Sequence, residues 1–171
     1  MKGGGLAVRH LQMFGTAALL SLCALTAFGQ SAEFKRMQIA TDRKAEMFAL
    51  QDLYWPLMDV KTGKSDDFAA AAAAASVVPE RLDPFVSLLV PGTARGEAPG
   101  ARAKPEVWEQ PDAVAAAVDE LKARAADLAA AASAGDSLAY GAAFDAFAEA
   151  CKACHGLRPS SGGPFRFAHG E

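Results

Sequence analysis

Valine, isoleucine and threonine are scarce in this chain of 171 residues, while alanine recurs in long runs. Because β-branched residues favour strands and alanine is the strongest helix former, the composition excludes an all-β fold and predicts an all-α one. Hydrophobic residues make up 51% of the sequence, too large a share for a disordered chain, so a real core is expected. The 17 Lys and Arg against 20 Asp and Glu show no basic excess, and the sequence therefore gives no electrostatic case for a nucleic-acid partner.

The apolar run near the N-terminus, residues 14–25, is shorter than the roughly 18–20 apolar residues that a membrane span needs. It follows Lys2 and Arg9, precedes Ala27-Phe28-Gly29, and lies in a stretch without acidic residues. This pattern is typical of an export signal with a small-x-small cleavage site, the alternative being a retained membrane anchor. We therefore predict a signal peptide over residues 1–29, export to the periplasm, and no membrane span in the mature chain.

Four later segments have helical periodicity, at about 32–61, 65–78, 111–134 and 137–157. Apolar residues recur in them at spacings of three and four, which gives each segment one apolar face. Pro56 is expected to kink the first segment, and Pro79 and Pro84 to break the chain after the second. Helices with single apolar faces favour an antiparallel up-down-up-down four-helix bundle over residues 30–158. Residues 159–171 are predicted to form a flexible tail.

The last predicted helix ends in a C-x-x-C-H motif, Cys151-Lys152-Ala153-Cys154-His155. This is the attachment pattern of c-type haem: each thiol forms a thioether with one vinyl group of the porphyrin, and the histidine becomes the proximal iron ligand. On a helix, Cys151 and His155 are four positions apart, and Cys154 lies on the adjoining edge. We therefore predict one covalent haem c per chain, attached at Cys151 and Cys154, with His155 bound to the iron. An alanine-rich core has little bulk of its own and would gain from such an apolar group.

Three other chemistries use the same residue types. A redox-active C-x-x-C pair is expected in a βαβ context, which this chain lacks. A zinc site needs a fourth ligand, and the other histidine of the mature chain is His169, in the predicted tail. A structural disulfide is compatible with an oxidising compartment, although two cysteines three positions apart on a helix close poorly. Export and the adjacent histidine favour haem.

With this motif at the end of the last of four helices, the chain resembles the class II cytochromes c, the cytochrome c-prime family. Two further stretches carry the resemblance, residues 43–47 in the first helix and residues 101–108 before the third. The resemblance covers residues 32–158 and implies the four-helix bundle fold. It also implies two types of haem site. A methionine on the far side of the iron gives a six-coordinate haem suited to electron transfer, whereas an apolar cover leaves a five-coordinate haem that accepts NO or CO.

Met47 matches the methionine that binds iron in the low-spin relatives. Arg43, four positions earlier on the same face, is placed to reach a haem propionate. The resemblance therefore implies an electron carrier in which Met47 is the second axial ligand. The alternative is that Met47 fills a gap in the core or covers an open iron, as methionine often does. Met37 and Met58, ten and eleven positions away, are less suitable as ligands.

Relatives commonly carry a basic residue four positions after the haem histidine, but here Arg158 stands three positions after it and Pro159 takes the usual place. Lys152 and Arg158 could form a docking patch for periplasmic redox partner proteins, ordinary solvated charges being the alternative. Relatives also form homodimers through their first two helices, and this chain permits the same. Since the sequence contains no nucleophile–base spacing and no phosphate-binding loop, we do not expect an enzyme.

Overall fold

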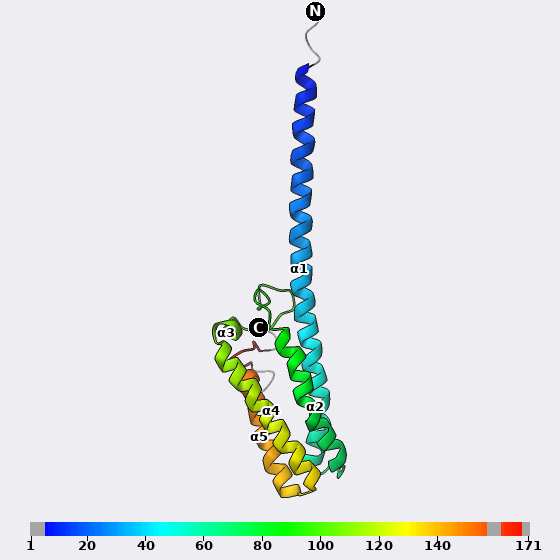
Figure 1. Ribbon diagram of the computed structural model, residues 1–171, viewed down its shortest axis with the longest axis vertical. Helices are drawn as coiled ribbons and strands as arrows, with labels where there is room; N and C mark the ends of the chain where they lie inside the picture. The colour runs from blue at the N-terminus through cyan, green and yellow to red at the C-terminus, as the bar shows by residue number, and fades with distance from the viewer. Residues whose placement is uncertain (1–5, 157–161, 169–171) are drawn as a thin grey trace, which may run out of the picture.

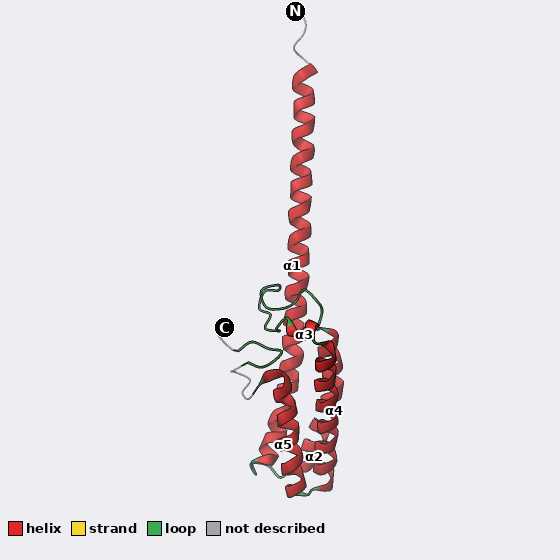
Figure 2. Ribbon diagram, turned by 90° about the vertical axis from the view of Figure 1, so that its left-hand side faces the viewer, coloured by secondary structure: helices red, strands yellow, loops and turns green. Residues whose placement is uncertain are grey.

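The computed structural model of the chain describes residues 6–156 and 162–168, with side chains from Ser31 onward. These residues form five α-helices and no strand: α1 (Leu6–Lys61), α2 (Phe68–Ser87), α3 (Glu106–Glu109), α4 (Pro111–Ala134) and α5 (Ser137–His155). Helices α1, α2, α4 and α5 run alternately up and down beside one another, and α3 is a single turn before α4 (Figures 1 and 2). The prediction of an all-α, antiparallel four-helix bundle is confirmed.

Helix α1 begins much earlier than its predicted start near residue 32. It is continuous from Leu6 through the predicted cleavage point after Gly29 and extends far beyond the other helices (Figure 1). It also continues through Pro56 and ends at Lys61, where Gly63 has a positive φ of 72°. No helix in the described part of the chain combines the length and the hydropathy of a membrane span.

Helix α2 corrects one prediction from the sequence. It begins after Asp67, whose carboxylate accepts a hydrogen bond of 2.8 Å from the Ala70 N–H and caps the first turn. Pro79 and Pro84 do not break the chain, because both lie inside this helix. Each proline removes one backbone hydrogen bond, but the apolar face continues across them, with Val78 and Leu82 only 1% and 3% exposed. Burial of the apolar face of α2 therefore outweighs the helix-breaking tendency of the two prolines.

The core lies where the four long helices face one another. It combines small alanines with a few large side chains: Leu57, Val78, Leu82, Leu128, Tyr140, Phe144 and Phe147. Helix α2 packs along both α1 and α4, and α4 packs along α5, whereas α1 and α5 make few contacts with each other. In Figure 1 the α4–α5 pair diverges from the α1–α2 pair toward the end at which α5 stops. We call this the motif end, and the opposite end, with the turns at 62–67 and 135–136, the closed end.

Part of the C-terminal segment lies against the body of the protein. Residues 162–168 are hydrogen-bonded to the long connection between α2 and α3: Lys104 N–H donates to Phe165 O and Phe167 N–H to Arg102 O, each at 3.0 Å. Residues 162–168 thus have backbone partners in the body of the protein, and the flexible tail over 159–171 stays a prediction. The other residues of that range lie outside the described residues.

Candidate functional site

The C-x-x-C-H motif occupies the last turns of α5. The helix begins after Asp136, whose carboxylate accepts hydrogen bonds from the N–H groups of Leu138 and Ala139. It ends at His155, because Gly156 has a φ of 72° and its N–H donates back to Lys152 O at 2.8 Å. Cys151, Cys154 and His155 are therefore held on one rigid helical end, and all three are half-buried.

The two thiols of the motif are free in the structure. Burial raises the pKa of Cys151 to about 11, with a further contribution from Cys154, and burial also raises the pKa of Cys154. A redox-active C-x-x-C pair works in the opposite way, since it lowers the pKa of its attacking cysteine. These surroundings thus disfavour a redox-active pair.

The imidazole of His155 has the state and the setting of a metal ligand. Burial, and then the positive charge of Arg166, lower its pKa to about 4, so the ring is neutral at pH 7. Its buried Nδ1 has no hydrogen-bond partner among the described residues, a situation that costs about 1–3 kcal/mol. A neutral imidazole is the form that binds metals. No group of three or more His, Cys, Asp or Glu in the described ranges is arranged to hold a metal ion.

Helix α1 contacts α5 through the ring of Tyr54. The rings of Tyr54 and Phe144 lie 5.5 Å apart and fix the register of the two antiparallel helices. Seven residues of an α-helix span about 10 Å, so the residues seven positions from Tyr54 and from Phe144, toward the motif end, lie at the same level of the bundle. This count brings Met47 on α1 to the level of Cys151 on α5. The sequence spacing alone did not establish this level, because it depends on the register between helices far apart in the chain.

Met47 and Met58 have different surroundings. Met58 belongs to the half-buried layer that packs on the buried core cluster, and Met47 belongs to neither the cluster nor that layer. Met47 is nevertheless half-buried. The structure therefore separates a methionine that fills the core from one that lies at the level of the motif outside the core packing.

Arg43 anchors the connection that follows α2. Its side chain is only 6% exposed, and its guanidinium donates hydrogen bonds to Leu88 O, Thr93 Oγ1 and Thr93 O, at 3.2, 3.0 and 2.8 Å. Burial lowers its pKa. The guanidinium also lies 6.0 Å from the centre of the Trp108 ring. Contact between Arg43 and a haem propionate stays a prediction. The sequence did not indicate that Arg43 holds the connection after α2, because no sequence pattern marks Thr93 as the buried partner of Arg43.

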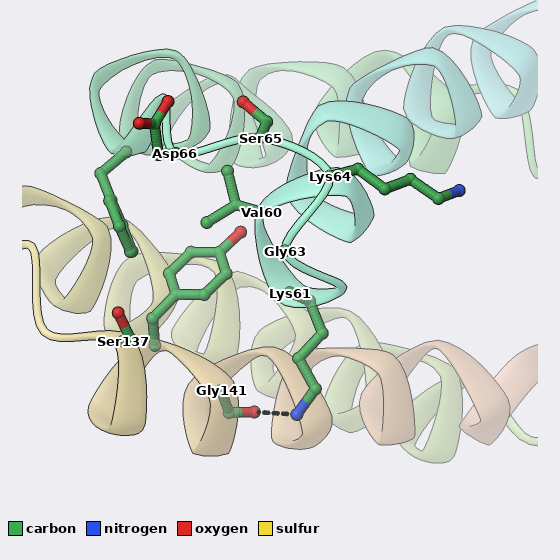
Figure 3. A pocket seen from close by; sticks show the side chains of 10 residues that line it. Val60, Lys61, Gly63, Lys64, Ser65, Asp66, Ser137 and Gly141 are labelled. Atoms are coloured by element: carbon green, nitrogen blue, oxygen red, sulfur yellow. Dashed lines mark hydrogen bonds between the residues drawn. The ribbon is translucent and has the colours of Figure 1, made fainter.

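A cavity of about 620 Å³ lies at the closed end, far from the motif (Figure 3). Lys61 points into it, but its ammonium already donates to Gly141 O at 2.8 Å and pairs with Asp145 at 2.7 Å. Figure 3 shows the first of these bonds, between Lys61 and Gly141. None of the predicted site residues lines this cavity, so it does not compete with the motif as the functional site.

The predicted docking patch is described only in part. Lys152 forms an ion pair with Glu149 on the same face of α5, so its charge is partly compensated. Arg158 and His169 lie outside the described residues.

Comparison with known proteins agrees with this site. Residues 38–156 match the sequence model of the family Cytochrome C′. The structure is similar to cytochrome c′ from Rubrivivax gelatinosus, with a TM-score of 0.63 and 26% identity over 77% of this chain and 96% of that one. It is also similar to a variant of cytochrome c prime from Alcaligenes xylosoxidans with bound NO, with a TM-score of 0.62 and 23% identity over 75% and 93% of the two chains. No curated protein matches the sequence.

A helical bundle with a C-x-x-C-H motif on its last helix defines a class II c-type cytochrome. Because the family match covers most of the chain, the chain belongs to the cytochrome c′ family. This family binds haem c covalently, and Cys151 and Cys154 provide the attachment motif near the C-terminus.

Proposed function

We propose that this protein is an exported electron carrier whose haem would be attached at Cys151 and Cys154, with His155 and Met47 binding the iron. One observation carries the choice of Met47: it lies at the level of Cys151, half-buried, yet outside the core packing that occupies Met58. The proposal includes cleavage of residues 1–29, a periplasmic location, redox partner proteins, and no turnover of an organic substrate.

When bound, the haem supplies a one-electron Fe(III)/Fe(II) couple. The chain's own residues determine how that couple behaves. The two cysteines fix the ring edge to a rigid helical end, and the low pKa of His155 keeps its imidazole neutral and available at pH 7. A thioether from Met47 would raise the reduction potential and block the coordination position that small gases use.

The second candidate is a five-coordinate haem protein that binds NO or CO. Solved structures of cytochrome c prime from Alcaligenes xylosoxidans carry NO in one variant and CO in another, the latter 24% identical over 75% of this chain. In this alternative, Met47 covers the open side of the iron without binding it.

Optical spectra of the purified holoprotein in both oxidation states test the choice. We expect low-spin spectra in the wild type, and high-spin ferrous haem that binds CO in Met47→Leu. Met58→Leu is the matched control, because it changes a methionine of the same helix that packs on the core, and its spectra should equal those of the wild type.

Two results would contradict the proposal. High-spin ferrous wild-type haem that takes up CO readily would favour the gas-binding candidate. Absence of covalently bound haem would reject both candidates. Export is tested separately, by the N-terminal sequence of the protein recovered from the periplasm, which we expect to begin at Gln30.

A further inference from the structure

Residues 162–168 form a small turn that rests on the connection before α3. Within the turn, the Gly163 N–H donates to Arg166 O at 2.8 Å. Outside it, the hydrogen bonds from Lys104 and Phe167 described above join the turn to residues 102–104, and Ala103 and Arg166 form a bridge. The segment is therefore tied to the body of the protein on one side.

On its other side, the turn rests directly on the backbone of the haem motif. A Cβ atom at Gly163 would collide with Gly156 N and with the backbone of Cys154 and His155. A Cβ at Gly156 would in turn collide with Gly162 O. Gly163 does not have a positive φ, so its lack of a side chain serves this close approach and not a special backbone conformation. The two backbones touch where the proximal histidine leaves α5.

Positively charged side chains lie on and around the same turn. The Phe167 ring has the guanidinium of Arg95 4.7 Å from its centre and the ammonium of Lys104 at 5.3 Å. Arg166 lies on this turn: it bridges to Ala103, and its backbone O accepts the N–H of Gly163, the residue that lies against the backbone of Cys154 and His155. Arg166 follows His155 by eleven positions, so no helical spacing predicts this neighbourhood.

We propose that residues 162–168 are a clasp that fixes the His155 end of α5 to the 102–104 connection, and that Arg166 on this clasp tunes the electrostatics of the proximal ligand. The inference rests on haem ligation by His155. Ferric haem carries one positive charge more than ferrous haem, so a fixed cation next to the ligand disfavours the ferric state. Arg166 should therefore raise the reduction potential of the iron.

The docking of the clasp is tested with Gly163→Ala in the holoprotein. Trypsin cleavage after Arg166, followed by mass spectrometry, should be many times faster in this variant than in the wild type, because the added methyl group displaces the turn. Gly141→Ala is the control: it also adds a methyl group to the α5 region, but its nearest neighbour, Lys61 Nζ, is at an ordinary 3.5 Å. Equal cleavage rates in the wild type and Gly163→Ala would overturn the clasp.

The role of the charge is tested by redox titration of Arg166→Gln, Arg166→Lys and Arg95→Gln. We expect a lower reduction potential in Arg166→Gln and a potential near that of the wild type in Arg166→Lys. Arg95→Gln removes one charge from the other side of Phe167 and should shift the potential less. An unchanged potential in Arg166→Gln, or an equal shift in Arg95→Gln, would overturn the tuning role.

These readouts separate the inference from the proposed function. Each variant is compared with the wild type, so the difference is readable whether or not Met47 binds the iron. A protein without covalent haem would reject the proposed function, whereas the trypsin comparison reports on the clasp alone.

Discussion

The two ends of the bundle are held together in different ways. At the closed end, α1 and α5 contact each other directly: the Tyr140 hydroxyl donates to Leu57 O at 2.8 Å, and Lys61 pairs with Asp145. At the motif end, the connections between helices provide the contacts: Arg43 bonds to Thr93, and residues 102–104 bond to residues 162–168.

The two ends therefore depend on different kinds of contact. Direct contacts at the closed end fix the register of α1 and α5, whereas the loops tie the motif end. Met47 on α1 and Cys151 on α5 lie at the level of the motif end where we propose that the haem binds. We expect stability at the motif end to depend on the cofactor and the loops, and stability at the closed end to depend on neither.

The largest expected effect comes from preventing haem attachment with Cys151→Ser and Cys154→Ser together. Hydrogen exchange should show local opening free energies near zero over residues 147–155, as at a fraying terminus, with residues 140–145 still protected. Uniform loss of protection at both ends would contradict the distinction between them.

Arg43→Ala should have the next largest effect, a loss of about 2–4 kcal/mol of unfolding free energy, because it leaves Leu88 O and Thr93 without their charged donor. Denaturant unfolding of the holoprotein measures it. Arg81→Ala, at an exposed position on α2, is the control and should change stability by less than about 0.5 kcal/mol. A loss below 1 kcal/mol in Arg43→Ala would show that the connection is held by other contacts.

Tyr140→Phe tests the closed end and should cost about 1–2 kcal/mol through the lost bond to Leu57 O. Burial raises the pKa of Tyr140 from 10 to about 12. The folded state therefore holds this proton more tightly than the unfolded state does. The contribution of the protonated Tyr140 hydroxyl to the free energy of unfolding is therefore complete below pH 10 and is lost as the pH rises toward 12. Denaturant unfolding between pH 8 and 12 should show this loss in the wild type and a smaller one in Tyr140→Phe; identical pH profiles would refute it.

The smallest expected effect is that of Asp136→Ala, which removes the cap of α5 at the closed end. We expect a loss of about 1 kcal/mol in thermal or denaturant unfolding, without a change in the haem spectra. Asp112→Ala is the matched control, because Asp112 lies in the first turn of α4 without capping it, and it should cost only a few tenths of a kcal/mol. A changed haem spectrum in Asp136→Ala would show that the two ends are coupled.

The sequence predicts the helices and the attachment motif well because these depend on local patterns. The start of α5 after Asp136 and the position of the C-x-x-C-H motif on its last turns both follow from short-range spacing. The sequence does not predict those features that depend on contacts between segments far apart in the chain. Pro79 and Pro84 stay helical because the α2 face is buried against its neighbours, and the partners of Arg43 come from a loop 45–50 positions away. The clasp pairs residues more than 60 positions apart, and its glycine contacts leave no periodic signal.

The most direct test is the mass and the absorption of the denatured protein after expression in a host that matures c-type cytochromes. The account predicts one haem that remains bound through denaturation in the wild type and no bound haem in the Cys151→Ser and Cys154→Ser variant. Wild-type protein that is colourless after denaturation, with both thiols open to alkylation, would contradict it.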